Sequence, residues 1–231
     1  MTFVVELLMH IRHITIGKAQ LTIFAGRDEL FSAAADEFFR AVLSAQQQGW
    51  APAIALSGGS TPRSAYELIA RRAITDPALA AIDWRNLHLF FGDERCVPPS
   101  DKDSNYRMVR ESLLSNSALG AAHVHRIRAE LRPQEAAAQY EEELKQHFKG
   151  SLPQFDLIFL GLGPDGHTAS LFPGTAALGV VDRWVVANAV PQQNTTRITS
   201  TYPVLNAAAE VLFLVAGVEK NDAMRHALRE R

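Results

Sequence analysis

The chain has little of several things that mark specialised protein classes. It contains one cysteine, Cys96, which excludes an internal disulfide and a cysteine-built zinc site and indicates a reducing compartment, the cytoplasm. Charges of the two signs nearly cancel, with 23 Lys and Arg against 25 Asp and Glu, and no basic run occurs. We therefore expect no nucleic acid as a partner, although a few local arginines would suffice to bind a small anion.

Long hydrophobic runs are also absent. No segment reaches the roughly 18 apolar residues that span a bilayer, so we expect no membrane partner. Residues 3–11 are apolar, but Glu6 interrupts them and no basic start or small-residue cleavage site accompanies them, unlike a signal peptide. We interpret residues 1–20 as an N-terminal extension, either an extra strand or an irregular start, ahead of a single domain over residues 21–231.

What is present is an ordinary globular composition, with 231 residues of which 47% are hydrophobic and 21% charged. Apolar runs typical of strands alternate with segments of helical spacing. We expect strands at 21–25, 52–57, 87–91, 155–160, 184–189, 197–200 and 210–216, and helices at 28–48, from 62 onward, and at 103–114, 133–148 and 218–229. This alternation predicts an α/β fold with a doubly wound, mainly parallel sheet and helices on both faces, a Rossmann-like arrangement. Ligands of such folds bind beyond the carboxyl ends of the strands.

Small and polar residues follow the second predicted strand, in the order Ser57-Gly58-Gly59-Ser60-Thr61-Pro62. The glycines let the backbone approach a ligand closely, and Pro62 is expected at the first helical position, where neighbouring amides point outward. With the hydroxyls of Ser60 and Thr61, such a helix N-terminus attracts phosphate. The segment predicts either a phosphate site or a plain strand-to-helix turn.

A second glycine-rich loop, at 161–168, follows a later predicted strand. Its spacing matches a dinucleotide fingerprint, but Pro173 and Gly174 leave little room for the helix that this motif requires. It also lacks the lysine of a nucleotide phosphate loop, because His167 stands in that place. The loop presents this histidine beside Asp165, and imidazole is the side chain best matched to proton transfer near neutral pH. We expect either a catalytic His167 or a histidine that caps a short helix.

Charged residues stand on further loops. Asp93, Glu94 and Arg95 come directly after an apolar strand. The carboxylates are expected to orient a sugar hydroxyl or another side chain, and Arg95 to contact phosphate, unless the three form a local salt-bridge cluster. Arg197 and Lys220 are isolated cations that, together with Arg95, would surround a dianion.

Metal and thiol chemistry have little support in the sequence. Cys96 has no evident base beside it, so we expect an inert, packed thiol. The pairs His123/His125 and His10/His13 lack a carboxylate or further ligands at suitable spacing. We therefore expect no metal site.

Together these motifs resemble the 6-phosphogluconolactonase family. The segments that carry the resemblance are LSGGSTP at 56–62, FGDERCVP at 91–98, SNY at 104–106 and GLGPDGHTASLFP at 161–173. They occur in the expected order, the last is highly specific, and the resemblance runs from about residue 21 to the C-terminus. The related glucosamine-6-phosphate deaminases share the fold and a similar Asp-Gly-His loop. They usually carry Gly-Thr-Gly-Ser where this chain has Ser-Gly-Gly-Ser.

The resemblance implies hydrolysis of 6-phospho-D-glucono-1,5-lactone to 6-phosphogluconate, the second step of the oxidative pentose phosphate pathway. It implies no cofactor and no required metal, and its partner is a small sugar-phosphate lactone. We expect a monomer or a weak homodimer. Family members typically continue beyond the position of Arg231 through another short strand, so we expect the sheet edge to differ here. The alternatives are a glucosamine-6-phosphate deaminase or isomerase, and a non-catalytic sugar-phosphate sensor.

The mechanistic hypothesis divides the site in two. The loop at 57–61 with Arg95, Arg197 and Lys220 is expected to bind the phosphate, which orients the reacting carbon from a distance. His167 is expected to take a proton from the attacking water, with Asp165 or a backbone group holding its tautomer. The oxyanion is expected to meet loop amides around 163–166 or an arginine.

Overall fold

The computed structural model of the chain describes residues 2–6, 12–115 and 117–228. Its main sheet consists of β1 (Thr2–Glu6), β2 (Arg12–Ile16), β3 (Ala19–Phe24), β4 (Ala53–Leu56), β5 (His88–Phe91), β7 (His123–Val124), β8 (Leu157–Leu160) and β11 (Val211–Val215). A smaller sheet contains β6 (Asp93–Arg95), β9 (Val185–Val190) and β10 (Thr195–Ser200). The helices are α1 (Arg27–Gln47), α2 (Ser60–Thr75), α3 (Asn105–Val109), α4 (Pro133–His147), α5 (Tyr202–Ala207) and α6 (Asn221–Leu228).

The strand order of the main sheet is β2-β3-β1-β11-β8-β4-β5-β7 in the part of the chain that the structure describes. Every neighbouring pair is parallel except β2 with β3. The central strands β4 and β8 are buried along their whole length, because helices cover both faces. The prediction of a doubly wound, mainly parallel sheet is confirmed.

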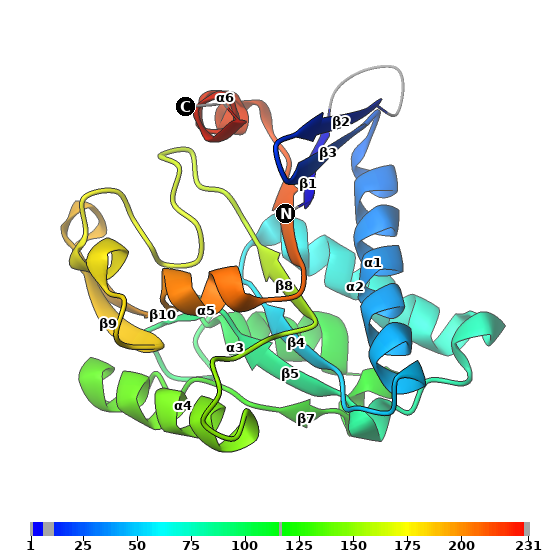
Figure 1. Ribbon diagram of the computed structural model, residues 1–231, viewed down its shortest axis with the longest axis horizontal. Coiled ribbons are helices and arrows are strands. Elements are labelled where there is room, and N and C mark those ends of the chain that lie inside the picture. The colour runs from blue at the N-terminus through cyan, green and yellow to red at the C-terminus, as the bar shows by residue number, and fades with distance from the viewer. Residues whose placement is uncertain (1, 7–11, 116, 229–231) are drawn as a thin grey trace.

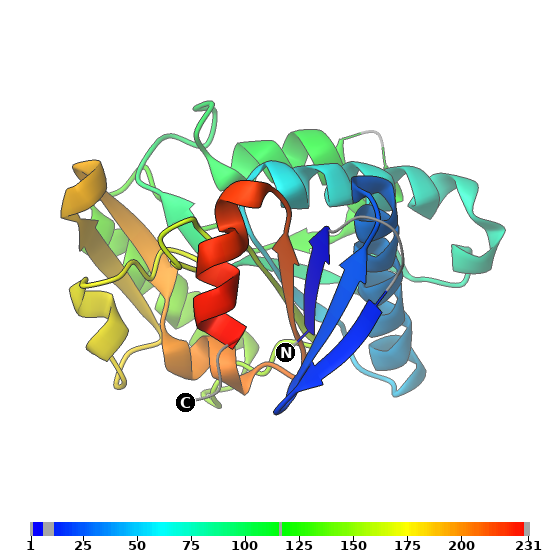
Figure 2. The ribbon, with the colours of Figure 1, turned by 90° about the horizontal axis from the view of Figure 1, so that it is seen from above.

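The two helical layers follow from the direction of the crossovers. Right-handed connections that step from β3 through β4 and β5 to β7 put α1, α2 and α3 on one face, and α1 packs on α2. The return steps to β8 and β11 put α4 and α5 on the opposite face, as Figures 1 and 2 show. Strands β4 and β8 are neighbours in the sheet, and the chain segments that follow them pass over opposite faces of the sheet. The crevice at their carboxyl ends is the switch point at which ligands bind in such folds.

The N-terminal stretch forms strands, as the extra-strand alternative expected, and these strands join the main sheet. β1 pairs in parallel with β3 on one side and β11 on the other, and β2 forms an antiparallel hairpin with β3. The expected domain boundary at residue 21 falls inside β3. The described residues before it therefore belong to the sheet, because their backbone hydrogen bonds are made with its strands.

Other elements depart from the expectations in informative ways. Residues 93–95, expected as a loop, form β6, which pairs with β10. The two segments expected as strands at 184–189 and 197–200 are β9 and β10, but they join β6 in the small sheet and not the main one. α2 begins at Ser60, so Pro62 lies within its first turn, where the missing amide hydrogen costs nothing. No helix follows β8 directly, in agreement with the rejection of both nucleotide motifs.

Candidate active site

A cavity of about 260 Å³ opens at the switch point, where the loops after β4, β8 and β11 meet. It is lined by Ser57 to Pro62, Asp93, Arg95, Asn105, Gly161 to Gly163, His167, Ala169, Leu214 to Ala216, Glu219 and Lys220. The structure thus brings most of the expected site residues together around one space. The other expected site residues, Asp165, Glu94 and Arg197, are not among the lining residues.

The loop after β4 is fixed from below and open toward the cavity. The Tyr66 hydroxyl accepts from the Ser57 N–H at 3.0 Å and donates to the Ser57 carbonyl at 3.2 Å, which pins the loop to the next turn of α2. Gly59 precedes α2 with φ +109° and offers no side-chain cap, so the first amides of the helix remain available. Ser57 itself is buried, and its hydroxyl has no hydrogen-bond partner among the described residues. A buried, unpaired hydroxyl on a cavity wall is a ready donor for a ligand.

The loop after β8 holds His167 in one orientation. The ring Nδ1 lies 2.5 Å from Oδ1 of Asp165, and the His167 amide also donates to this oxygen at 3.2 Å. On its other side the ring stacks on Phe172, with centroids 4.0 Å apart. Although burial opposes it, these hydrogen bonds from His167 lower the pKa of the Asp165 carboxyl. An ionised Asp165 accepts from Nδ1–H, which leaves Nε2 as the nitrogen with a free lone pair.

Glycine is required at one point of this loop. A Cβ on Gly163 would lie 2.1 Å from Nδ1 of His167 and 2.6 Å from Oδ1 of Asp165. The backbone of the loop is closed by hydrogen bonds from the Gly163 amide to the His167 carbonyl (2.7 Å) and from the Gly166 amide to the Gly163 carbonyl (3.0 Å). These two amides are therefore used inside the loop. They do not serve as the oxyanion donors that the sequence analysis considered.

Asp93 ties the histidine loop to the small sheet. Its carboxylate accepts from the Ser170 hydroxyl at 2.6 Å and from the Asn105 amide at 3.3 Å. The Asn188 side chain donates to the Ser170 carbonyl at 2.8 Å. Asp93 thus combines a place on the cavity wall with a structural function.

Glu94 has turned away from the cavity. This buried carboxylate accepts from the backbone amides of Arg95, Asn105 and Tyr106 and from the Ser104 hydroxyl. Burial raises its pKa, while the three backbone hydrogen bonds oppose the rise. It holds the start of α3, where Ser104 is the N-cap. Of the readings that the sequence left open for this carboxylate, orientation of other protein groups is the one observed.

The three expected cations occupy different positions. Arg95 and Lys220 line the cavity, and Arg95 also donates to the Asp103 carbonyl at 2.5 Å. Arg197 lies directly across the strand pair from Arg95 and donates to Gln193 at 2.9 Å. Burial, followed by the charge of Arg95, lowers the pKa of Arg197. Arg197 therefore adds positive potential next to Arg95 without lining the cavity.

Two polar side chains in the cavity lining, those of Asn105 and Glu219, had no role assigned to them from the sequence. Asn105 is buried and packs so closely on Gly58 that a Cβ there would meet its Oδ1 at 1.9 Å. The Ser104-Asn105-Tyr106 segment was part of the resemblance, which is the signal that pointed to it. Glu219 also lines the cavity beside Lys220, and nothing in its sequence surroundings distinguished it.

A group of histidines lies elsewhere. His88, His125 and His147 bring one ring nitrogen each to within 4.8 Å of one another. No metal site was expected, because the pairs His123/His125 and His10/His13 lack a carboxylate or further ligands at suitable spacing; His10 lies outside the described residues. The fold brings them together.

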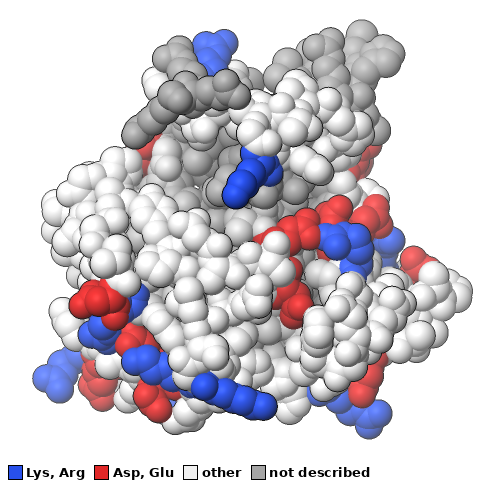
Figure 3. All heavy atoms as spheres, in the orientation of Figure 1, with Lys and Arg blue, Asp and Glu red and all other residues white. Residues whose placement is uncertain are grey.

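Charges are mixed on the surface that Figure 3 shows. Among its described residues, blue and red side chains are interspersed and form no continuous basic area. Within the described chain, none of the helices has both the length and the apolar character that crossing a membrane would require.

Comparison with known proteins identifies the relatives of this chain. A family model described as glucosamine-6-phosphate isomerases/6-phosphogluconolactonase matches residues 25–231. The chain is 45% identical over 175 residues to a 6-phosphogluconolactonase of Synechocystis sp., covering 74% of this chain and 69% of the relative. It is 38% identical over 172 residues to that of Haemophilus influenzae, covering 74% and 71%.

Solved structures agree with these relatives. The 6-phosphogluconolactonase structure from Trypanosoma brucei superposes with a TM-score of 0.74 at 30% identity, covering 90% of this chain and 85% of that one. The structure from Thermotoga maritima gives a TM-score of 0.76 at 27% identity, covering 99% and 90%. The resemblance inferred from the four motifs is thereby confirmed, and the chain belongs to the glucosamine-6-phosphate isomerase/6-phosphogluconolactonase family.

Proposed function

We propose that this chain hydrolyses 6-phospho-D-glucono-1,5-lactone to 6-phosphogluconate, the second step of the oxidative pentose phosphate pathway. The observation that carries the proposal is the presence of an oriented His167 and a phosphate-suited helix N-terminus on the walls of one cavity. The names of the relatives, 6-phosphogluconolactonase, support the choice of the lactone over an amino-sugar phosphate.

The phosphate end of the substrate is assigned to the loop after β4. Free amides at the start of α2, the unpaired Ser57 hydroxyl and the hydroxyls of Ser60 and Thr61 suit phosphate oxygens. Cationic side chains on the cavity wall, Arg95 and Lys220, neutralise the dianion. Arg197, the register partner of Arg95 on the neighbouring strand, strengthens the positive potential beside it.

The reacting end is assigned to His167. Because Asp165 holds Nδ1–H, Nε2 accepts a proton from water as the water oxygen bonds to the lactone carbonyl carbon. The tetrahedral intermediate then collapses, the ring C–O bond breaks, and the proton passes from Nε2 to the leaving alkoxide. With the amides of Gly163 and Gly166 engaged in the loop, a cationic side chain of the cavity is the favoured partner of the oxyanion.

The decisive experiment is a coupled assay with freshly generated lactone, corrected for spontaneous hydrolysis. Wild-type protein should accelerate 6-phosphogluconate formation, and glucosamine 6-phosphate should release no ammonia. Ammonia release would instead indicate the deaminase reaction. Binding of 6-phosphogluconate without turnover of either substrate would indicate a sensor.

The assignment of the cations has its own test. Arg95→Gln and Lys220→Gln are compared with the phosphorylated and dephosphorylated lactones. A phosphate anchor raises KM for the phosphorylated substrate far more than for the other, whereas an oxyanion partner lowers kcat for both. Equal losses on both substrates in KM for Arg95→Gln would contradict its assignment as an anchor.

Cellular context and assembly complete the proposal. A reducing compartment, the cytoplasm, suits a chain whose single thiol, Cys96, is half-buried and has its pKa raised by burial. We expect the protein to act as a monomer or weak homodimer. Sedimentation at increasing protein concentration measures this directly.

A further inference from the structure

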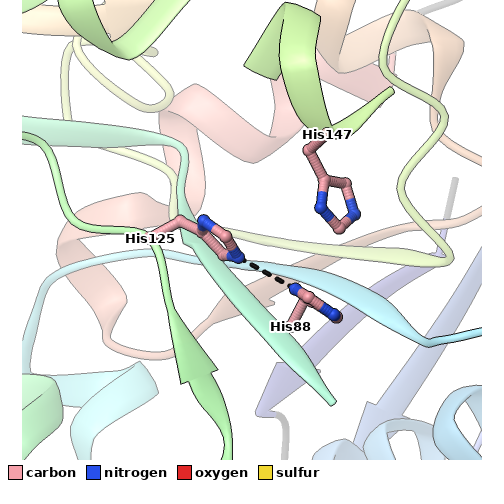
Figure 4. A group of neighbouring side chains, drawn as sticks. All are labelled: His88, His125 and His147. Atoms are coloured by element: carbon pink, nitrogen blue, oxygen red, sulfur yellow. Dashed lines mark hydrogen bonds between the residues drawn. The ribbon is translucent and has the colours of Figure 1, made fainter. Parts of the chain in front are cut away.

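Three histidines from separate elements converge at the edge of the main sheet, away from the candidate active site. His88 begins β5, His125 directly follows β7, and His147 ends α4. One ring nitrogen of each lies within 4.8 Å of the others. Figure 4 shows the rings of His88 and His125 edge to edge, with the His147 ring beside them.

The fold explains the convergence. His88 and His123 are register partners in the parallel β5–β7 pair, and His125 follows two residues later on the same face of the strand. That face carries α4, on which Glu143 and His147 are one turn apart and project side by side. His88 and His125 are 37 residues apart in the sequence, so no local motif reveals that they are neighbours.

We propose that His88, His125 and His147 bind one divalent transition-metal ion of the class that prefers imidazole, with Zn²⁺ as the representative ion. Tetrahedral Zn²⁺ with bonds of about 2.0–2.1 Å separates its nitrogen ligands by roughly 3.3 Å. His88 Nδ1 and His125 Nε2 are 2.9 Å apart. A small opening of this pair and a rotation of the His147 ring bring all three nitrogens to bonding distance.

The surroundings are those of a metal site. Nδ1 of His125 lies 2.7 Å from Oε1 of Glu143, so the carboxylate fixes the tautomer and directs the lone pair of Nε2 toward the centre of the group. Phe90 stacks on the His125 ring at 4.2 Å and contacts His147, which gives the site an apolar wall. Three protein ligands leave the fourth position to water.

Proton balance is simple in this arrangement. Without metal, His125 Nε2 accepts the hydrogen bond that His88 Nδ1–H donates, because Glu143 holds the His125 proton on Nδ1. On binding, the ion takes the place of that shared proton. As a neutral imidazole, His88 carries a single ring proton, which moves from Nδ1 to Nε2 by exchange with water, so that the Nδ1 lone pair binds the ion and no net proton is released.

The site is independent of the proposed lactonase reaction. His88 lies at the amino end of β5, whereas the cavity lies beyond the carboxyl end, about 10 Å further along at the usual strand rise. The ion would cross-link β5, the segment after β7 and α4. We expect the ion to affect the stability of the fold. Variants of His88, His125 and His147 are expected to turn over the lactone at the wild-type rate.

Calorimetric titration of the metal-free full chain with ZnCl₂ tests the proposal. We expect one ion per chain, with affinity reduced by more than about 100-fold in His88→Ala and His147→Ala, and by about 10–100-fold in Glu143→Gln. His226→Ala removes an exposed histidine of α6 and serves as the matched control with unchanged affinity. His167→Ala should also bind normally, which separates this site from the candidate active site.

Wild-type protein provides a second reading that needs no variant. Zn²⁺ must raise its Tm in a concentration-dependent way, and Co²⁺ must give the visible absorption of tetrahedral nitrogen coordination. Absence of both effects overturns the proposal. So does full-strength binding in a His88→Ala/His147→Ala protein, or binding that disappears in His167→Ala alone.

Discussion

At the scale of single residues, the proposed mechanism depends on the orientation of one imidazole. Asp165 and Phe172 hold the His167 ring from two sides, and the ring nitrogen that faces away from Asp165 is the only one left to act as a base. Replacing His167 by Ala should lower kcat by about 10²–10⁴-fold, the usual contribution of a general base. Steady-state kinetics with matched circular dichroism spectra measure this. Wild-type turnover in the variant would eliminate His167 as the base.

Gly163 gives a sharper test of positioning. Gly163→Ala puts a methyl group into the space of the His167–Asp165 pair, so we expect kcat to fall by at least about 10-fold with little change in KM. Gly179→Ala is the matched control, because a Cβ there meets nothing within 4 Å, its φ is not positive and it lies outside the cavity lining. Equal activities for the two variants would show that the pair does not need its observed geometry.

The acid limb of the pH profile follows from the same pair. Burial opposes ionisation of Asp165, but its hydrogen bonds from His167 lower the pKa of the carboxyl, so Asp165 stays ionised to lower pH than an ordinary aspartate. We expect kcat/KM to fall as pH is lowered, because a protonated imidazole has no lone pair, and to fall with the slope of a single proton. A slope of two in the measured profile would contradict an ionised Asp165.

At the scale of elements, the wall of the cavity depends on how α3 begins. Glu94 accepts hydrogen bonds from two backbone amides there and from that of Arg95, and its truncation to Ala leaves those three donors without a partner. We expect Glu94→Ala to reduce the free energy of unfolding by about 3 kcal/mol or more, and Glu94→Gln by roughly half as much, since the amide keeps one acceptor oxygen. Urea denaturation measures both. Wild-type stability of Glu94→Ala would show that water replaces the carboxylate.

At the scale of the whole molecule, the main sheet is completed by its first strand. A protein that starts at Ala19 lacks β1 and β2, so β3 loses its pairing with both strands and β11 loses its pairing with β1. Since each lost backbone hydrogen bond costs on the order of 1 kcal/mol, we expect the unfolding midpoint in urea to shift far down. A truncated protein as stable as the full chain would mean that β3 pairs directly with β11.

The site is also a property of the whole molecule. The phosphate-suited loop follows β4 and the histidine loop follows β8, about a hundred residues later, and they meet because these strands are neighbours at the switch point. The small sheet then brings Asp93 and Ser170 into contact and fastens the histidine loop to β6.

The sequence by itself determined what depends on local physics. Helical spacing predicted α1 and α4 to within a residue or so, apolar runs predicted β4, β5, β8 and β11, and residue types at strand ends predicted the Ser57–Pro62 and Gly161–Thr168 loops. Four ordered motifs also sufficed to recognise the family. These features are set by periodicity, glycine geometry and residue chemistry, which act over a few neighbouring positions.

The tertiary structure alone decided everything that depends on distant partners. It assigned Glu94 to the start of α3, put Arg197 next to Arg95, moved β9 and β10 into a second sheet, and inserted β1 between β3 and β11. It also gathered His88, His125 and His147, which no spacing rule connects. Strand order and side-chain contacts arise from packing between segments that are far apart in the chain. A local sequence pattern therefore does not determine which strands become neighbours.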